Sequence, residues 1–154
     1  MTPEFKIKRF NELSLQELYE VLQLRSEVFV VEQNCVYQDI DGKDGKALHL
    51  LGIYDGTVAA YSRLFAPGDY FDNASIGRVV ISPQYRDRKW GHRLMTSAIE
   101  GIQQHYDTGK ITISAQLYLK KFYEGHGFVQ DGEQYLEDDI PHIRMHSAFQ
   151  ISDF

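Results

Sequence analysis

The sequence predicts a mixed α/β fold in which a β-sheet of about seven strands is flanked by helices. Three observations support this prediction. The 154 residues, 43% hydrophobic and 25% charged, have the size and composition of one globular domain. Short β-rich runs alternate with stretches of helical apolar spacing, in the order β-α-β-β-β-α-β-α-β-β. An Asp-Gly pair between two of the β-rich runs predicts a tight hairpin and hence antiparallel strands.

The first half of the chain is predicted to hold one helix among antiparallel strands. Ser14-Leu15-Gln16-Glu17 has the form of a capping box, and the apolar positions that follow recur at helical spacing as far as Phe29. Asp55-Gly56 marks the hairpin. In chain order we expect a strand at 5–10, a helix over 15–29, an acidic loop at 34–45, and strands at 49–54 and 57–66.

The second half is predicted to hold two strand–helix–strand crossovers. Such crossovers favour right-handed connections between parallel neighbouring strands. The expected elements are a strand at 74–81, a helix from Trp90 through 102, a strand at 110–115, a short helix at 119–125, a strand beginning at Gly127, an acidic turn at 137–141 and a last strand at 142–148.

Charge and cysteine usage exclude several classes of protein. Lys and Arg number 16 and Asp and Glu 22, so a net charge of −6 argues against a general nucleic-acid partner. Cys35 is the single cysteine, which rules out an internal disulfide and suits a reducing compartment. No apolar run approaches a membrane span, and the first residues lack the apolar core of a signal peptide. We therefore expect a cytoplasmic protein without a membrane partner.

The segment 76–95 is the most informative part of the chain. An apolar strand enters a loop and then a helix with Gly91 in its first turn. The first amides of a helix have no internal partner and can bind a diphosphate, and glycine allows close approach to the backbone. A solvated basic helix start is the alternative. The cations gathered here are Arg86, Arg88, Lys89 and Arg93.

Arg86-x-x-Lys89-x-Gly91 resembles the Arg/Gln-x-x-Gly-x-Gly/Ala loop of the GNAT superfamily of N-acetyltransferases, which holds the pyrophosphate of coenzyme A. The resemblance departs at Lys89, where the superfamily usually has glycine. Because lysine does not adopt positive φ cheaply, we expect the loop to bend differently and the lysine amine to meet a phosphate. The resemblance implies a centrally splayed sheet and a cofactor site formed by Val79, Val80, Ile81, Arg86, Asp87, Arg88, Lys89, Trp90, Gly91 and His92.

A second motif supports the first. Residues 123–128, Tyr-Glu-Gly-His-Gly-Phe, fit the superfamily's Tyr-x-x-x-Gly-Phe motif, whose tyrosine is commonly the general acid. Tyr123 is therefore the catalytic candidate, with packing beneath the cofactor as the alternative. Seven residues earlier, where the superfamily often has a cofactor-binding asparagine, this chain has Gln116, which makes similar hydrogen bonds.

Two further segments resemble the ElaA-like branch of the superfamily. They are Arg25-x-x-x-Phe29-Val30-Val31-Glu32-Gln33-x-Cys35-x-Tyr37-x-Asp39-x-Asp41 and Tyr135-Leu136-Glu137-Asp138-Asp139-Ile140-Pro141-His142-Ile143. With them the resemblance covers essentially the whole chain. It implies one acetyltransferase domain over residues 1–154.

The resemblance implies an acetyl-CoA-dependent N-acetyltransferase that moves an acetyl group to a primary amine by direct attack on the thioester. A non-catalytic acyl-CoA-binding or regulatory module on the same fold is the alternative, and an unrelated α/β protein is a third. Tyr123 is expected to protonate the leaving thiolate, and a backbone N–H of the strand at 79–81 to polarise the carbonyl. The general base stays open among a water chain and three substrate-site candidates, Glu32, His49 and His142.

The acceptor is expected to be a small-molecule or protein amine, and the protein a monomer or homodimer. The acidic loops at 39–44 and 137–139 suggest a cationic amine, with solvated surface loops as the alternative. A catalytic role for Cys35 is disfavoured because no activating partner is evident. We expect no metal, because Cys and His residues lack paired ligand spacing and the aspartates from 39 lack a complete calcium-loop pattern.

Overall fold

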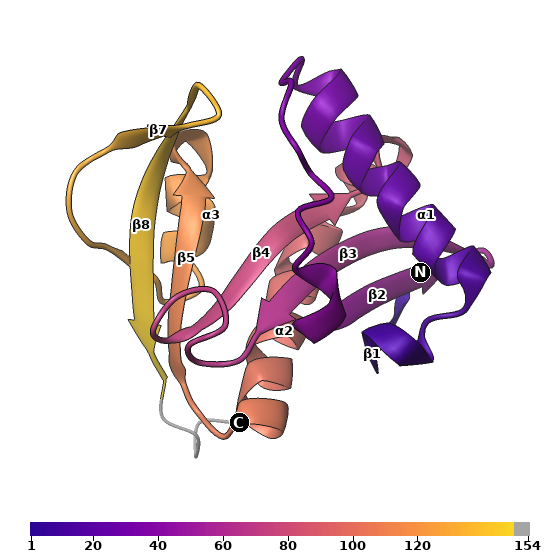
Figure 1. Ribbon diagram of the computed structural model, residues 1–154, viewed down its shortest axis with the longest axis horizontal. Helices are drawn as coiled ribbons and strands as arrows, with labels where there is room; N and C mark the ends of the chain where they lie inside the picture. Colours follow the sequence, from indigo (N-terminus) through magenta and orange to yellow (C-terminus); the bar gives the residue numbers. More distant parts are fainter. Residues whose placement is uncertain (150–154) are drawn as a thin grey trace.

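The computed structural model describes residues 1–149 and confirms the mixed α/β fold, with helices on both sides of one sheet (Figure 1). Within these residues the sheet has eight strands, in the order β1-β2-β3-β4-β5-β8-β6 with β7 paired to β8. The strands are β1 (Glu4–Arg9), β2 (Leu48–Tyr54), β3 (Thr57–Phe65), β4 (Ala74–Ile81), β5 (Lys110–Gln116), β6 (Val129–Gln130), β7 (Tyr135–Glu137) and β8 (Ile140–Ala148). The helices are α1 (Leu15–Arg25), α2 (Trp90–Tyr106) and α3 (Lys120–Glu124).

Short helical segments connect the main elements. They are the 3₁₀ turns η1 (Phe10–Glu12), η3 (Asp44–Lys46), η4 (Pro83–Arg88) and η5 (Leu117–Leu119), and the π-helical η2 (Ser26–Glu32). Helix α1 begins at the predicted capping box: the Ser14 hydroxyl accepts from the Glu17 amide at 3.0 Å, and the Glu17 carboxylate accepts from the Ser14 amide at 2.9 Å. The helical path then runs through η2 to Glu32, three residues past the predicted end at Phe29.

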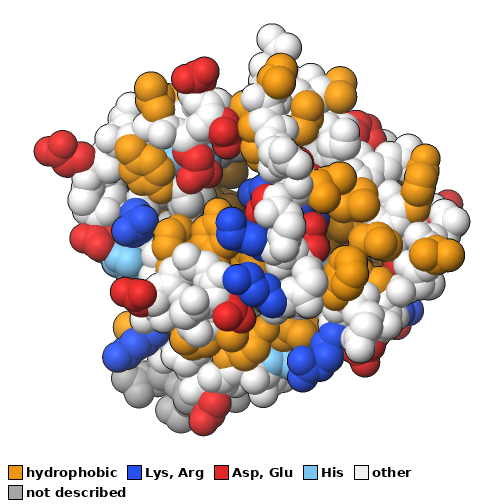
Figure 2. All heavy atoms as spheres, in the orientation of Figure 1, with side chains coloured by type: hydrophobic (Ala, Val, Ile, Leu, Met, Phe, Trp, Pro, Cys, Tyr) orange, Lys and Arg blue, Asp and Glu red, His pale blue; other side chains and the backbone are white. Residues whose placement is uncertain are grey.

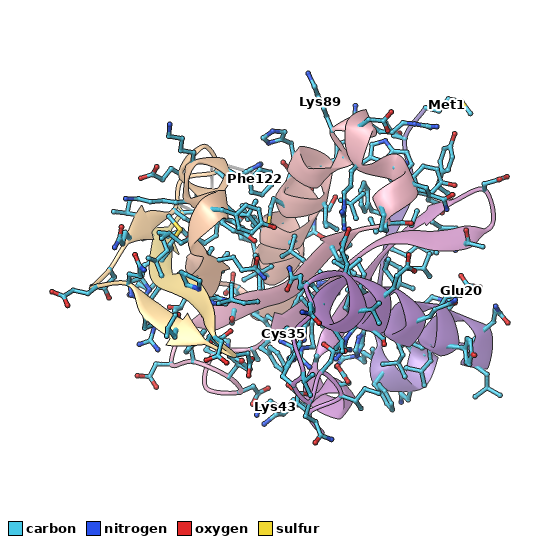
Figure 3. The ribbon with its side chains drawn as sticks, turned by 90° about the horizontal axis from the view of Figure 1, so that it is seen from above. Met1, Glu20, Cys35, Lys43, Lys89 and Phe122 are labelled. Carbon is cyan, nitrogen blue, oxygen red and sulfur yellow. The ribbon has the colours of Figure 1, made fainter. Side chains whose placement is uncertain are left out.

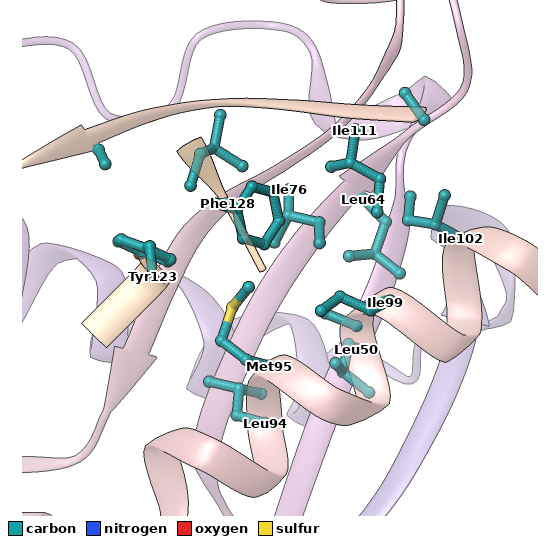
Figure 4. Packing of buried hydrophobic residues seen from close by; sticks show 14 of the residues in the cluster. Leu50, Leu64, Ile76, Leu94, Met95, Ile99, Ile102, Ile111, Tyr123 and Phe128 are labelled. Carbon is teal, nitrogen blue, oxygen red and sulfur yellow. The ribbon is translucent and has the colours of Figure 1, made fainter. Parts of the chain in front are cut away.

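The two faces of the sheet are covered by different helices. Alternate side chains of β2 and β3 face opposite ways, as a strand requires: Leu50 and Leu64 pack against α2, whereas Leu51 and Tyr61 pack against α1. Figure 4 shows the α2 side, where Leu94, Met95, Ile99 and Ile102 of the helix meet Leu50, Leu64, Ile76 and Ile111 of the sheet, with Tyr123 and Phe128 at one end. Both helices are thereby fixed against the central strands.

The sheet is splayed at its centre, as the family resemblance implies. The parallel strands β4 and β5 pair through Ala74–Ile111 and Ser75–Thr112, and farther along β4 no register partners follow on β5. The two strands diverge towards the carboxyl end of β4 (Figure 1). The backbone groups of β4 in the diverging part are therefore free of a sheet partner on that side.

The prediction of two parallel crossovers is half wrong. The β4-α2-β5 crossover joins parallel neighbours, but β8 lies between β5 and β6 and is antiparallel to both. Strand β8 lies next to β5 because it forms the longer ladder: it pairs with seven residues of β5, whereas β6 is only two residues long.

The predicted acidic turn at 137–141 is also narrower than expected. Glu137 belongs to β7 and pairs with Ile140 of β8, which leaves the two-residue turn Asp138-Asp139. Both aspartates have positive φ, 51° and 63°, as tight hairpins of the type I′ family require. This hairpin brings the β7 and β8 side chains to the splay.

Candidate active site

A cavity of about 600 Å³ lies at the splay. Its walls come from η2 and the segment after it, the second half of β4, the first turn of α2, β5 with the following α3, and the β7–β8 hairpin. The space-filling view shows the surface hollowed between these parts, with acidic and basic side chains beside the hollow (Figure 2). Nine of the predicted site residues line the cavity: Glu32, Val79, Val80, Ile81, Arg86, Gly91, Gln116, Tyr123 and His142.

Strand β4 carries a β-bulge at the cavity. The register between β3 and β4 runs from Tyr61–Val80 to Arg63–Gly77, so Arg78 and Val79 together oppose Ser62. Arg78 has φ of 51°, and the Ser62 hydroxyl donates to the Gly77 carbonyl at 2.9 Å. Such a bulge disrupts the ladder and redirects backbone groups, which is typical of strands beside active sites. The bulge was not predicted from the sequence.

A buried ionic network holds the bulge in place. Arg78 donates through Nε to the Asp39 carboxylate at 2.8 Å and through Nη2 to the Asp39 carbonyl at 3.2 Å. The other Asp39 carboxylate oxygen accepts from Arg25 Nε at 3.0 Å. Because Arg25 and Asp39 are buried, Arg78 is tied to the interior of the fold. We call this group, together with Asp41, Asp44 and Arg63, the Arg–Asp network.

The second half of the network runs through Asp44. One Asp44 oxygen accepts from Arg25 Nη1 at 2.8 Å and from Arg63 Nη1 at 3.0 Å. Asp41 receives two parallel hydrogen bonds from Arg63, both 2.9 Å long. Three arginines thus neutralise three aspartates. The predicted negative acceptor face at 39–44 is therefore wrong for Asp39, Asp41 and Asp44, which are ion-paired within the protein.

The turn between β4 and α2 has the conformation that a glycine would favour. Lys89 adopts φ of 60° and ψ of 29°, the left-handed region, so the expectation that the lysine bends the loop differently is wrong. Its side chain extends away from the ribbon (Figure 3). No side chain caps the first turn of α2, and a Cβ at Gly91 would meet the Phe122 ring at 3.5 Å, an ordinary contact. The first amides of α2 are therefore available to an anion.

Arg86 and Glu32 form an ion pair at the edge of the cavity. Arg86 Nη1 donates to Glu32 Oε2 at 2.6 Å, and Nη2 donates to Glu32 Oε1. Both side chains are partly exposed. The Arg86 guanidinium lowers the pKa of the Glu32 carboxyl, so Glu32 is anionic and already has a partner.

Five predicted cofactor residues do not line the cavity: Asp87, Arg88, Lys89, Trp90 and His92. Trp90 is buried, and Arg88 lies 5.3–5.8 Å from the ring centres of Tyr54, Tyr85 and Trp90. His92 Nδ1 instead lies 3.0 Å from His126 Nε2, beside α3. Any contact of Trp90 with a ligand is thereby limited to its backbone.

Tyr123 reaches the cavity from α3. Its side chain is 6% exposed and packs edge-on against Phe122 and Phe128. Burial raises the pKa of the Tyr123 phenol, and nearby Tyr118 adds to the rise. The phenol therefore stays protonated at neutral pH. In this state it can donate a proton, but it cannot act as a base.

His49 and His142 have different surroundings. His49 is 1% exposed, lies outside the cavity, and has both ring nitrogens occupied, at 2.7 Å from the Tyr61 hydroxyl and 2.9 Å from the Asp44 carbonyl. Its predicted substrate role is therefore corrected to that of a core residue beside the Arg–Asp network. His142 lines the cavity, with Nδ1 at 2.7 Å from the Ile140 carbonyl and Nε2 at 3.4 Å from Glu137 Oε2.

Two groups of side-chain hydrogen bonds near the predicted residues were not predicted from the sequence. The Gln33 and Gln116 amides exchange hydrogen bonds of 3.3–3.4 Å between the end of η2 and the end of β5. Ser114 donates to Glu137 Oε1 at 3.0 Å and lies 2.5 Å from the Tyr135 hydroxyl. Both groups of contacts join residues that lie far apart in the chain, so no local sequence pattern predicts them.

Cys35 also lines the cavity, where its thiol donates to the Asp138 carbonyl at 3.3 Å. Burial raises the pKa of the Cys35 thiol, and the charges of Asp138 and Asp139 raise it further. A protonated thiol is a poor nucleophile, which agrees with the low expectation of a catalytic role.

Comparison with known proteins decides the family. Residues 10–149 match the acetyltransferase (GNAT) domain family. The chain belongs to the GNAT acetyltransferase family. Protein ElaA of Escherichia coli (strain K12) is 42% identical over 144 residues, which cover 92% of this chain and 94% of ElaA. This likeness confirms the resemblance to the ElaA-like branch of the GNAT family.

Solved structures agree with this assignment. An acyl-CoA N-acyltransferase from Pseudomonas aeruginosa superposes with a TM-score of 0.88 at 44% identity, over 94% of this chain and 99% of that one. The crystal structure of E. coli ElaA gives a TM-score of 0.84 at 41% identity, over 94% and 99% of the two chains. The GNAT fold and membership in an acyltransferase family are thus established for this chain.

The described part of the chain offers neither a cluster of metal ligands nor a membrane-spanning helix. Residues 1–149 contain no group of three or more His, Cys, Asp or Glu side chains arranged to hold a metal ion. They also contain no helix with the length and apolarity needed to cross a membrane.

Proposed function

We propose that this protein is an acetyl-CoA-dependent N-acetyltransferase that acetylates a primary amine by direct attack on the thioester. The observation that carries the proposal is a convergence on one cavity: the β4 bulge, the uncapped start of α2 and the buried phenol of Tyr123 all face it. Membership in the GNAT family and the likeness to an acyl-CoA N-acyltransferase support the choice of a CoA thioester.

The residues present fit coenzyme A. The β4 strand beyond Ser75 has no partner on β5, so its backbone at 79–81 is free to pair with an extended arm. The first amides of α2 suit a diphosphate, and Arg86 adds a cation at the same end of the cavity. The paired amides of Gln33 and Gln116 offer further donors and acceptors on the facing wall.

Each part of the chemistry then falls to a group of this chain. Acetyl-CoA supplies the acetyl group on a thiolate leaving group. A backbone N–H of the bulged strand polarises the carbonyl, and the Tyr123 phenol donates its proton to the departing thiolate. The bulge places Arg78 and Val79 in the wall of the cavity, and their amides are the donors that we assign.

A test of cofactor binding uses two arginines of the same 3₁₀ turn. Arg86 lines the cavity, whereas Arg88 lies over the Tyr54, Tyr85 and Trp90 rings. In calorimetry with acetyl-CoA, Arg86→Ala should weaken binding about tenfold at low salt and less at high salt, while Arg88→Ala should leave it within twofold. Equal affinity of wild type and Arg86→Ala would contradict the placement.

A test of catalysis follows thiol release from acetyl-CoA with a panel of amines. Amine-dependent release supports the enzyme. Tight binding of acetyl-CoA without release by any amine would support the alternative, a non-catalytic acyl-CoA-binding or regulatory module.

We further propose that one acetyltransferase domain spans residues 1–154, of which 150–154 lie outside the described residues. No metal takes part, the acceptor is a small molecule or a protein amine, and the protein works as a monomer or homodimer without nucleic-acid or membrane partners. The single cysteine suits the reducing conditions of the cytoplasm.

A further inference from the structure

We propose that Glu137 and His142 form a site for the charged ammonium form of the acceptor, and that His142 takes the proton that the ammonium loses. The inference rests on the proposed acetyl transfer and names its substrate class, a primary alkylammonium group. Both side chains line the same cavity as Tyr123 and flank the Asp138-Asp139 hairpin.

The hydrogen bonds around His142 define its free nitrogen. The Ile140 carbonyl can only accept, so the Nδ1–H of His142 donates to it across 2.7 Å. When the ring is neutral, Nε2 is therefore the nitrogen with the free lone pair. That lone pair lies 3.4 Å from Oε2 of Glu137.

Oε2 of Glu137 is a carboxylate oxygen and Nε2 carries the lone pair of the neutral ring, so both atoms accept hydrogen bonds. An ammonium group has three donors and can donate to both atoms at once.

Glu137 is held for this task by a short chain of hydroxyl groups. The Ser114 hydroxyl donates to Glu137 Oε1 at 3.0 Å. Because Ser114 has one proton to give, the Tyr135 hydroxyl donates to Ser114 across 2.5 Å. The Tyr135 ring also stacks on the His142 ring, with centres 6.2 Å apart and planes at 24°. Glu137 Oε2 therefore stays directed at His142.

The charge of this end of the cavity favours a cation. Asp39 is neutralised within the Arg–Asp network, and Glu32 is paired with Arg86. Among the described residues, Glu137 has only His142 as an ionic partner, and it is 43% exposed. The other charged or titratable groups around the pair are Tyr135, Asp138, Cys35 and, near Tyr135, Tyr70 and Arg144.

The proton balance of the step is complete. The ammonium gives one proton to His142 Nε2, and the resulting amine lone pair forms the C–N bond as the C–S bond breaks. The thiolate takes a proton from Tyr123, the amide nitrogen sheds its second proton to restore Tyr123, and His142 releases its proton to solvent. One proton leaves per turnover.

The experiment compares Glu137→Gln and His142→Gln with Asp139→Asn, which removes one charge from the same hairpin at a residue outside the cavity. Acetyl-CoA is paired with primary alkylamines (n-butylamine, spermidine and a lysine peptide) and with p-substituted anilines, which are uncharged at neutral pH. We expect Glu137→Gln to raise KM for the alkylamines about tenfold to 100-fold and to leave KM for the anilines unchanged.

His142→Gln should lower kcat about 100-fold. It should also change the pH profile of kcat/KM, which a merely structural role would leave as it is in wild type. All three variants should bind acetyl-CoA within twofold of wild type. Wild-type kinetics in Glu137→Gln, or a wild-type pH profile in His142→Gln, would overturn the inference while the proposed function stands.

A second measurement does not depend on turnover. Side-chain ¹⁵N spectra of the coenzyme A complex should show a change in the His142 Nε2 signal when butylammonium is added, and no such change should occur in Glu137→Gln. An unchanged His142 signal in wild type would overturn the inference. If wild type instead fails to bind acetyl-CoA, the proposed function itself fails.

Discussion

Removing the Asp41 carboxylate should lower the free energy of unfolding, and the contacts of Asp41 with Arg63 determine by how much. Burial by itself raises the pKa of Asp41, but the two hydrogen bonds from Arg63, the Arg63 charge and the Lys43 amide together outweigh it and lower the pKa from the usual 3.8 to about 2. At about 1.4 kcal/mol per pKa unit, a shift of this size corresponds to about 2 kcal/mol of stability at neutral pH. Since the Asp41 side chain retains some contact with solvent, we expect about 1–2 kcal/mol from the ionic term.

The sign and pH range of this effect follow from the direction of the shift. A carboxyl group whose folded pKa is lowered contributes its full stability above its unfolded pKa, near 3.8, and loses it as the pH falls through about 2. In Asp41→Asn the buried Arg63 also loses one of its two carboxylate partners, so the total cost at pH 7 should reach about 3 kcal/mol. The unfolding free energy of the variant should then depend less steeply on pH below 4.

Urea unfolding at pH 7 and at intervals down to about pH 2 measures both quantities. Asp139→Asn is the matched control, because it removes an exposed aspartate and should change stability by less than about 0.5 kcal/mol. Equal midpoints for Asp41→Asn and Asp139→Asn would refute the assignment of the Arg–Asp network as a stabilising support of the bulge.

Three further predictions concern the cavity and the turn that leads into α2. Because the pKa of the Tyr123 phenol is raised above its usual 10, the pH profile of kcat should show no loss of the general acid below pH 10; an earlier fall that Tyr123→Phe abolishes would contradict this. Lys89→Gly should relieve a left-handed residue and raise Tm by about 2 °C in calorimetry, as a net gain of about 0.5–1 kcal/mol implies; an unchanged or lower Tm would show that Lys89 is unstrained. Glu32→Gln should free Arg86 and tighten acetyl-CoA binding a few-fold at low salt; weaker binding would show that Glu32 aids the cofactor.

Local signals in the sequence predicted much of the fold. The capping box at Ser14, the hairpin at Asp55-Gly56 and the apolar face of α2 all depend on residues a few positions apart, and all are found. The order of β8 and β6 depends instead on which strand offers the longer ladder, and local periodicity carries no such information.

The candidate site was predictable where a motif exists. Arg86, Gly91, Gln116 and Tyr123 all line the cavity. The Arg–Asp network was not predictable, because its partners lie 14 to 39 residues apart and its aspartates resemble a solvated acidic loop. The prediction that Lys89 changes the bend of the turn was wrong for a different reason. Lys89 adopts the left-handed conformation at the cost of strain, and the turn does not rearrange.

The proposed reaction of a CoA thioester in this cavity, with Tyr123 as the proton donor, is tested by thiol release from acetyl-CoA in Tyr123→Phe. The assay uses an amine that wild type acetylates, and acetyl-CoA affinity is measured in parallel. We expect unchanged affinity and turnover lowered about 10²–10⁴-fold, because only the phenol oxygen is removed. Wild-type turnover in Tyr123→Phe, or the absence of amine-dependent release by wild type, would contradict it.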